Sequence, residues 1–214
     1  MSAAPPRIDE LLDFWFGELE DGFVAPEVRR RWFRADPAFD DALRTRFGED
    51  VEAALAGERD AWASTPEGRL ALVLLLDQLP RNLFRGTARA FAGDERAVAA
   101  ARVGVGRGDD RLLPPEQRVF LYLPFEHAEH RADQQTAVVL LERLRDALTA
   151  RPAARGILED YLAHAREHRE LVRRFGRFPH RNAALGRPST DEERAWLARD
   201  GRSFGQTGSS SPAT

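Results

Sequence analysis

Two short motifs in this sequence combine a proline break with an arginine and an asparagine. They are Leu79-Pro80-Arg81-Asn82, which follows a run of aliphatic residues, and Phe178-Pro179-His180-Arg181-Asn182, which lies near the C-terminus. Guanidinium and amide groups at helix ends commonly hold an anion or the carbonyl oxygen of a partner. The two motifs therefore predict where a ligand site lies, although they do not identify a reaction.

The residues before the first motif predict a buried helix that carries a charge. Leu70–Leu76 is apolar on all sides, and Asp77 continues one face of the same helix. A buried carboxylate needs a partner, because burial without one is unfavourable or raises its pKa. Arg81 can supply that partner, and Pro80 has no N–H to donate to the Leu76 carbonyl. Two interpretations remain open: a kinked core helix with a structural Asp77–Arg81 pair, and a ligand site.

A second cluster of ionisable residues occupies Pro124–His130. Glu126 and Glu129 share a helical face, and Glu126 can also reach His130. Such a cluster suits general acid–base chemistry, or metal binding with a third element. His130 fits a solvated polar turn better, whereas Glu126 and His127 are the better candidates for a pocket.

A third candidate is His168, in the middle of an apolar stripe that includes Tyr161 and Val172. A lone histidine in such a stripe is more often a hydrogen-bonded core residue than a ligand. The segment His164–His168 also matches the H-x-x-E-H pattern of some metalloproteases, but this short match has no supporting context. We therefore do not predict a metal site here.

The segment Phe175–Pro188 combines glycine, phenylalanine, histidine, asparagine and arginine in a way that is unusual for a connecting loop. It can form a ligand site, or a structured loop in which Arg177 and Arg187 cap nearby helix ends. The first interpretation is favoured. The aromatic and basic stretches Phe14–Phe16 and Arg29–Phe33 are instead assigned to the core and to a solvated face.

The composition restricts both the class of protein and its chemistry. The chain has 214 residues, of which 43% are hydrophobic, and this favours one helical domain over residues 1–201. Residues 202–214 are rich in serine and glycine and are predicted to be disordered. The sequence has no cysteine, and all 32 basic residues are arginine. These facts exclude disulfides, thiolate nucleophiles, Schiff-base lysines and a P-loop lysine.

The charge and the apolar runs restrict the partners. A net charge of −3 gives no general attraction for nucleic acid. Residues 1–6 lack the charged and apolar regions of a signal peptide, and the aliphatic run Leu70–Leu76 is far shorter than the roughly 18 residues of a membrane span. We expect a soluble, cytoplasmic protein whose partners include neither nucleic acid nor membrane, and leave the oligomeric state open.

The hydrophobic pattern is helical almost throughout, and no alternation typical of a strand is convincing. Asp36 and Thr65, each followed by proline, predict helix N-termini, and Gly17 and Gly176 predict helix ends. The other predicted helices are Asp9 to Phe16, one opening at Pro114-Pro115, Asp133 to about Ala150, Pro152 to Phe175, and a last short helix after a Ser189/Thr190 capping box. Short turns between helices predict an all-α fold, either a bundle or a helical hairpin stack.

Several strings together resemble a bacterial family known as domain of unknown function 924 (DUF924). The strings are Leu12–Gly17, Leu75–Asn82 with Arg85-Gly86, Phe91–Asp94, Leu123–Glu129 with Gln134, His168 through Asn182 to Gly186-Arg187, and Ser189–Glu193. The chain departs from the family pattern at Ala128, where serine is usual, and at His130, where aspartate is usual. The resemblance implies an all-helical, tetratricopeptide-like fold built from helical repeats, although the sequence itself shows no clear repeat. It implies no activity.

The working hypothesis is that the polar residues of these clusters converge on one concave pocket. The candidate ligand-binding residues are Asp77, Gln78, Arg81, Asn82, Glu126, His127, Glu129, His168, Arg177, His180, Arg181, Asn182 and Arg187. Among them, Glu126, His127, His168 and His180 are the candidate catalytic groups. No metal and no cofactor is predicted.

Three interpretations of this set remain. The residues can bind a small anionic ligand or a peptide, serve an enzyme that uses a Glu/His acid–base pair on an anionic substrate, or form an internal network that fixes the fold. More polar groups are gathered than a scaffold needs, and no nucleophile, cofactor loop or complete metal set is recognisable. Binding is therefore favoured, with the enzyme as the alternative.

Overall fold

A computed structural model describes residues 6–32, 34 and 36–200. In these ranges every regular element is helical, and one isolated β-bridge joins Glu20 and Phe23. The α-helices are α1 (Pro6–Phe16), α2 (Pro26–Trp32), α3 (Pro37–Ala56), α4 (Pro66–Val73), α5 (Leu79–Leu83), α6 (Asp94–Arg107), α7 (Pro115–His127), α8 (Arg131–Ala147), α9 (Pro152–Phe175) and α10 (Asp191–Asp200). Short 3₁₀ or π turns are η1 (Asp60–Ser64), η2 (Leu74–Gln78), η3 (Ala88–Phe91), η4 (Asp109–Leu112) and η5 (Pro179–Arg181). The all-α class is confirmed.

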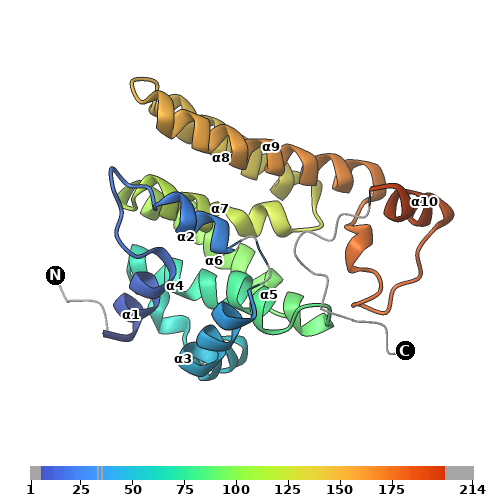
Figure 1. Cartoon of the computed structure of the whole chain (residues 1–214), viewed down its shortest axis with the longest axis horizontal. Helices are drawn as coiled ribbons and strands as arrows, with labels where there is room; N and C mark the ends of the chain where they lie inside the picture. Colours follow the sequence, from blue (N-terminus) through green and yellow to red (C-terminus); the bar gives the residue numbers. More distant parts are fainter. Residues whose placement is uncertain (1–5, 33, 35, 201–214) are drawn as a thin grey trace.

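The helices pack largely on their neighbours in the sequence. The two longest C-terminal helices, α8 and α9, lie side by side along one edge of the molecule, and α7 runs beneath them (Figure 1). Helix α6 packs on both α7 and α4, and α4 also contacts α1. Helix α3 packs on α5. Helix α2 packs against α7, where the rings of Trp32 and Phe120 are in contact.

Most helix ends lie where the capping residues predict them. The Asp36 side chain accepts hydrogen bonds from the first backbone N–H groups of α3, and the Thr65 hydroxyl accepts one from Gly68 in α4. Helix α9 ends at Gly176 with a φ of 72°. Thr190 and Glu193 form the predicted capping box of α10, each side chain bonding the other's backbone N–H.

Several elements differ from the prediction: α1 begins at Pro6 rather than Asp9, α2 was not predicted, and α6 and α8 also differ. Helix α8 begins at Arg131 and ends at Ala147, whereas the sequence predicts Asp133 to about Ala150. Helix α6 has no equivalent in the prediction, because its buried face consists of small residues, Ala97, Ala101 and Gly104, which give little hydrophobic contrast. The predicted disordered tail, residues 202–214, lies outside the described residues.

A turn of π-helix interrupts the buried run before the first proline motif. In η2, the N–H of Leu79 donates to the carbonyl of Leu74, one residue further back than in an α-helix. Pro80 explains this widening, because it has no N–H and its ring would collide with the carbonyl one turn earlier. Gly93 lies against the Leu76 carbonyl so closely that a Cβ there would be 2.1 Å from the oxygen. The widened turn carries Asp77 and Gln78.

The core is continuous over the first nine α-helices. Its aromatic part includes Trp15, Trp32 and Phe120, and the Trp32 and Phe120 rings are 4.5 Å apart. Phe14–Phe16 belongs to this core, as predicted. A smaller apolar cluster, formed by Leu171, Val172, Phe178 and Trp196, lies under α10. In the described part of the chain, no helix is both long enough and apolar enough to cross a membrane.

Candidate functional site

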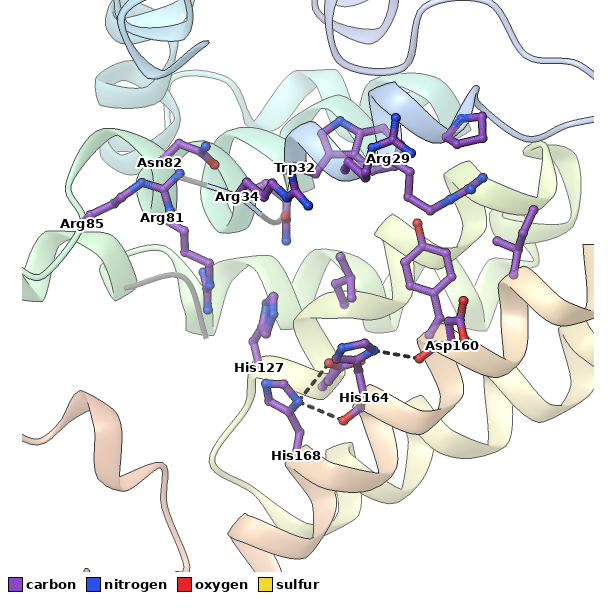
Figure 2. Close-up of a pocket in the computed structure, with 17 residues that line it drawn as sticks. Arg29, Trp32, Arg34, Arg81, Asn82, Arg85, His127, Asp160, His164 and His168 are labelled. Atoms are coloured by element: carbon purple, nitrogen blue, oxygen red, sulfur yellow. Dashed lines mark hydrogen bonds and ion pairs between the residues drawn. The ribbon is translucent and has the colours of Figure 1, made fainter. Parts of the chain in front are cut away.

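A cavity of about 570 Å³ lies between α2, α5, α7 and α9. Its lining residues are Pro26, Arg29, Arg30, Trp32, Arg34, Gln78, Arg81, Asn82, Arg85, Leu123, Glu126, His127, Ile157, Asp160, Tyr161, His164 and His168. Figure 2 shows two opposing walls: Arg29, Arg34, Arg81 and Arg85 on one side, and His127, His164 and His168 on the other. We call the first group, together with the lining residue Arg30 of α2, the arginine wall, and the second group the histidine wall.

Three lining arginines form ion pairs within the protein. Their partners are buried or half-buried carboxylates: Arg29 pairs with Glu116, Arg81 with Asp77 and Asp94, and Arg85 with Asp40. The distances are 2.6 Å for Arg29, 2.9–3.1 Å for Arg81 and 2.9 Å for Arg85. Their charges are therefore largely neutralised before any ligand arrives.

Arg30 and Arg34 differ from these three. Both are exposed side chains that line the cavity, and neither forms an ion pair or hydrogen bond with any residue that the structure describes. The arginine wall therefore keeps two cationic groups available to a ligand. The assignment of the arginine triplet to a solvated face fits the exposed Arg30 but is wrong for Arg29 and Arg31, which are partly buried. Arg29 and Arg30 also line the cavity, which the sequence did not predict.

On the histidine wall, Asp77 fixes the ring of His127. The Nδ1 atom of His127 lies 2.8 and 2.9 Å from the two carboxylate oxygens of Asp77, whose side chain is fully buried. Gln78 also donates to Asp77 at 2.5 Å, and Arg81 pairs with it. Burial alone would raise the pKa of Asp77, but Arg81 and His127 outweigh it and hold that pKa well below its usual range.

The ionised carboxylate determines the tautomer of His127. Because Asp77 can only accept, Nδ1 of His127 carries the proton and Nε2 keeps its lone pair. Nε2 forms no hydrogen bond within the described residues, and the side chain is still 15% exposed. Burial and the charge of Arg81 lower the pKa of His127, although Asp77 opposes them, so the ring is neutral at pH 7.

Glu126, directly before His127, lies beside His168. Its Oε1 lies 3.1 Å from Nδ1 of His168, which also donates to the backbone carbonyl of His164 at 3.0 Å (Figure 2). Burial, helped by the charges of Asp77 and Glu167, raises the pKa of Glu126 to about 8. Burial lowers the pKa of His168 well below its usual value. At neutral pH, Glu126 is therefore a carboxylic acid and His168 a neutral imidazole.

Asp94 joins the two proline motifs. It pairs with Arg81 of the first motif at 2.9 Å and with Arg181 of the second at 3.0 Å. The guanidinium of Arg181 also lies over the rings of Phe91 and Phe178, at 4.6 and 4.5 Å. Burial lowers the pKa of Arg181 to about 10, which leaves it charged at neutral pH.

The same surroundings keep His180 neutral. Burial, followed by the charges of Arg181 and Arg81, lowers the pKa of His180 to about 3. Neither His180 nor Arg181 lines the cavity. Arg181 is connected to the cavity through Asp94 and Arg81.

Four other sequence candidates lie in a separate group with Glu193 of α10, and we call this group the C-terminal ion cluster. Its members are Glu129, Arg177, Asn182, Arg187 and Glu193. Arg187 pairs with Glu129 at 2.5 Å, and Arg177 pairs with Glu193 at 2.7 Å. None of the cluster lines the cavity. These contacts correspond to the structured-loop interpretation of Phe175–Pro188.

The structure thus divides the candidate set. Six of the candidates line the cavity, and Asp77 lies directly behind His127. The six are Gln78, Arg81, Asn82, Glu126, His127 and His168. Sequence reasoning missed Arg30, Arg34, Asp160, Tyr161 and His164 as lining residues, and Asp94 as the link between the motifs. Among the described residues, no group of three or more acidic or histidine side chains has the arrangement of a metal site.

Comparisons with known proteins agree with the resemblance found in the sequence. The model of a bacterial protein family of unknown function, DUF924, matches residues 11–201. The chain is also similar to a solved structure from Agrobacterium tumefaciens, the protein of unknown function ATU0120, with 42% identity and a TM-score of 0.73. That match covers 89% of this chain and 96% of the other. A search of curated proteins found no match.

Proposed function

The chain belongs to the DUF924 family of bacterial proteins of unknown function, and on this premise we propose that it binds a small anionic ligand or peptide in the cavity between the arginine and histidine walls. One observation carries the proposal. Arg30 and Arg34 line the cavity without an acidic partner among the described residues, whereas the three other lining arginines are paired. Two guanidinium groups beside a concave surface suit a carboxylate or a phosphate.

The remaining lining residues suit the rest of such a ligand. Trp32, Leu123, Ile157 and Tyr161 provide apolar surface. Gln78, Asn82 and the histidines provide hydrogen-bonding groups around it. A volume of about 570 Å³ lies within the range typical of small-molecule pockets, and it would also admit the end of a peptide.

The enzyme alternative has a specific observation in its favour. Asp77 holds His127 in one tautomer and orientation, as a carboxylate does for the histidine of many hydrolases. A pocket that only binds an anion does not require this arrangement. The same cavity therefore suits an acid–base reaction on the anion that it binds.

Isothermal titration calorimetry tests the binding proposal. Pyrophosphate and citrate serve as phosphate and carboxylate probes, and at least one is expected to bind in a salt-dependent manner. The double variant Arg30→Ala/Arg34→Ala should weaken that binding by roughly tenfold or more, because each arginine supplies a charge-assisted hydrogen bond.

A matched control removes the same charge elsewhere. Arg166→Ala/Arg173→Ala deletes two exposed arginines of α9 that pair with Glu142 and Glu170, away from the cavity. Binding should then remain within about twofold of the wild type. Equal loss in both double variants would show a general charge effect, and no loss in the first would remove the cavity as the anion site.

A further inference from the structure

We infer that the cavity catalyses proton transfer at carbon: His127, held by Asp77, takes a proton from the carbon next to a carbonyl group of a small anion, while Glu126 hydrogen-bonds the carbonyl oxygen. This inference rests on the proposed function, because the anion must first be placed by the arginine wall. It adds a reaction class and a substrate class to that function. The substrate is a small carboxylate or phosphate that also carries a carbonyl group with an adjacent C–H.

The geometry of His127 is that of a general base. Both oxygens of Asp77 accept from Nδ1, so the ring cannot rotate without breaking two contacts. Nε2, on the opposite side of the ring, is left with its lone pair and has no hydrogen-bond partner among the described residues. Asp77 is itself fixed by Gln78 and Arg81. Asp77 therefore positions the base and stabilises the imidazolium that forms.

The charged and titratable groups that face His127 come from four further elements. They are Asp77 on η2, Arg81 on α5, Glu126 on α7 itself, His168 on α9, and His180 and Arg181 on η5. Burial and Arg81 keep the ring neutral at pH 7, and the neutral form is the one that can accept a proton.

Whereas neutral His127 can accept a proton, protonated Glu126 can donate a hydrogen bond. Its Oε1 lies beside the Nδ1–H of His168, so its proton belongs on Oε2. A buried carboxyl group that stays protonated at neutral pH can donate a hydrogen bond to a developing enolate oxygen. The base and this acid are consecutive residues of α7, and both line the cavity. A pair of titratable groups driven to different protonation states is the arrangement that proton transfer requires.

The lining residues offer no thiol, amine or aliphatic hydroxyl nucleophile. The sequence contains neither cysteine nor lysine, and no serine or threonine lines the described cavity. Enolisation needs only the two groups above. The C–H bond breaks, its proton goes to Nε2 of His127, its electron pair forms the C=C bond, and the C=O π pair moves to the oxygen, which accepts the hydrogen bond of Glu126. Return of a proton from Nε2 to the carbon reverses the step, so the reaction is redox-neutral and needs no co-reactant.

Proton NMR in D₂O provides the test. The probes are 2-oxoglutarate, which carries carboxylates, and dihydroxyacetone phosphate, which carries a phosphate. The full-length protein should accelerate exchange of the C–H protons next to the carbonyl of at least one probe above the buffer rate. His127→Gln should reduce that exchange by roughly 100-fold or more, because loss of a general base typically has an effect of this size.

Three further measurements separate catalysis from structure. His127→Gln should bind the same probe within about threefold of the wild type by calorimetry, which shows that the pocket is intact. The wild-type exchange rate should decline above about pH 8, where Glu126 ionises, and Glu126→Gln should remove that decline. Asp77→Asn should slow exchange even where circular dichroism shows an unchanged fold.

The outcomes distinguish this inference from the proposed function. Binding of both probes through Arg30 and Arg34 without exchange would overturn proton transfer and leave the binding proposal intact. Failure of both binding and exchange would overturn both. Hydrolysis of 4-nitrophenyl phosphate that depends on His127, without exchange of either probe, would replace proton transfer with a hydrolytic reaction.

Discussion

The cavity and the C-terminal ion cluster are built from similar residue types, yet their charges are used differently. In the cluster, each carboxylate meets an arginine: Glu129 meets Arg187, and Glu193 meets Arg177. The arginine wall of the cavity keeps Arg30 and Arg34 without acidic partners among the described residues. Residue type alone therefore does not distinguish the two regions, whereas the extent of ion pairing within the protein does.

Asp94 links Arg81 of the cavity to Arg181 of the second proline motif, and its loss should have the largest effect on stability. Asp94→Ala leaves the buried Arg181 without its carboxylate, which should lower the free energy of unfolding by about 3–5 kcal/mol. Urea denaturation followed by circular dichroism measures this change. Asp60→Ala, which removes the exposed partner of Arg96, should cost less than about 1 kcal/mol. A similar small cost at Asp94 would mean that the two motifs are not held together through this residue.

Glu126 should give the cavity a pH dependence that the C-terminal ion cluster lacks. Its pKa is raised to about 8 in the folded protein, above the value of about 4.3 for an unperturbed glutamate. The contribution of Glu126 to the free energy of unfolding is therefore fully present at low pH and is lost as the pH rises towards 8. Wild-type stability should fall by at most about 1.4 kcal/mol per pH unit from this group, and Glu126→Gln should remove that slope.

Urea unfolding at pH 5, 6.5 and 8 measures how the free energy of unfolding depends on pH, both in the wild type and in Glu126→Gln. Glu193 provides the contrast, because Arg177 lowers its pKa to about 2. Its stabilising effect is present above about pH 4.3 and is lost only as the pH falls towards 2. Glu193→Gln should therefore leave the slope between pH 5 and 8 unchanged. Identical slopes for Glu126→Gln and the wild type would contradict a protonated Glu126.

The smallest effect on stability is expected for the two arginines that the binding proposal needs most. Arg30→Ala/Arg34→Ala should change the free energy of unfolding by less than about 0.5 kcal/mol, because neither side chain pairs with a described residue. Arg177→Ala/Arg187→Ala should cost more than this, because Glu193 and Glu129 lose their partners. Thermal denaturation of the two double variants side by side makes the comparison. Equal losses would mean that Arg30 and Arg34 also have a structural role.

Local chemistry accounts for what the sequence could predict. Asp36, Thr65 and Gly176 fix helix ends through their own side chains or backbone freedom. The Asp77–Arg81 pair follows from its spacing on a helix, and it forms at 3.1 Å. These features depend on residues within one or two turns of each other.

Long-range packing accounts for what could not be predicted. Arg30 reaches the cavity because Trp32 docks α2 against Trp15 and Phe120, a contact between distant parts of the chain. Asp94 joins Arg81 and Arg181 only once α6 has packed, and the alanines and glycines of α6 give little signal of that helix. The division of the candidates between the cavity and the C-terminal ion cluster depends on these contacts.

The central claim, that the cavity is the anion site, is tested most directly by crystallography with an anomalous scatterer. Crystals grown without phosphate or sulfate can be soaked in selenate, whose selenium gives a position in an anomalous difference map. A peak is expected in the cavity within hydrogen-bonding distance of the guanidinium groups of Arg30 and Arg34. An empty cavity, with selenate bound instead at Arg177 or Arg187, would contradict this claim.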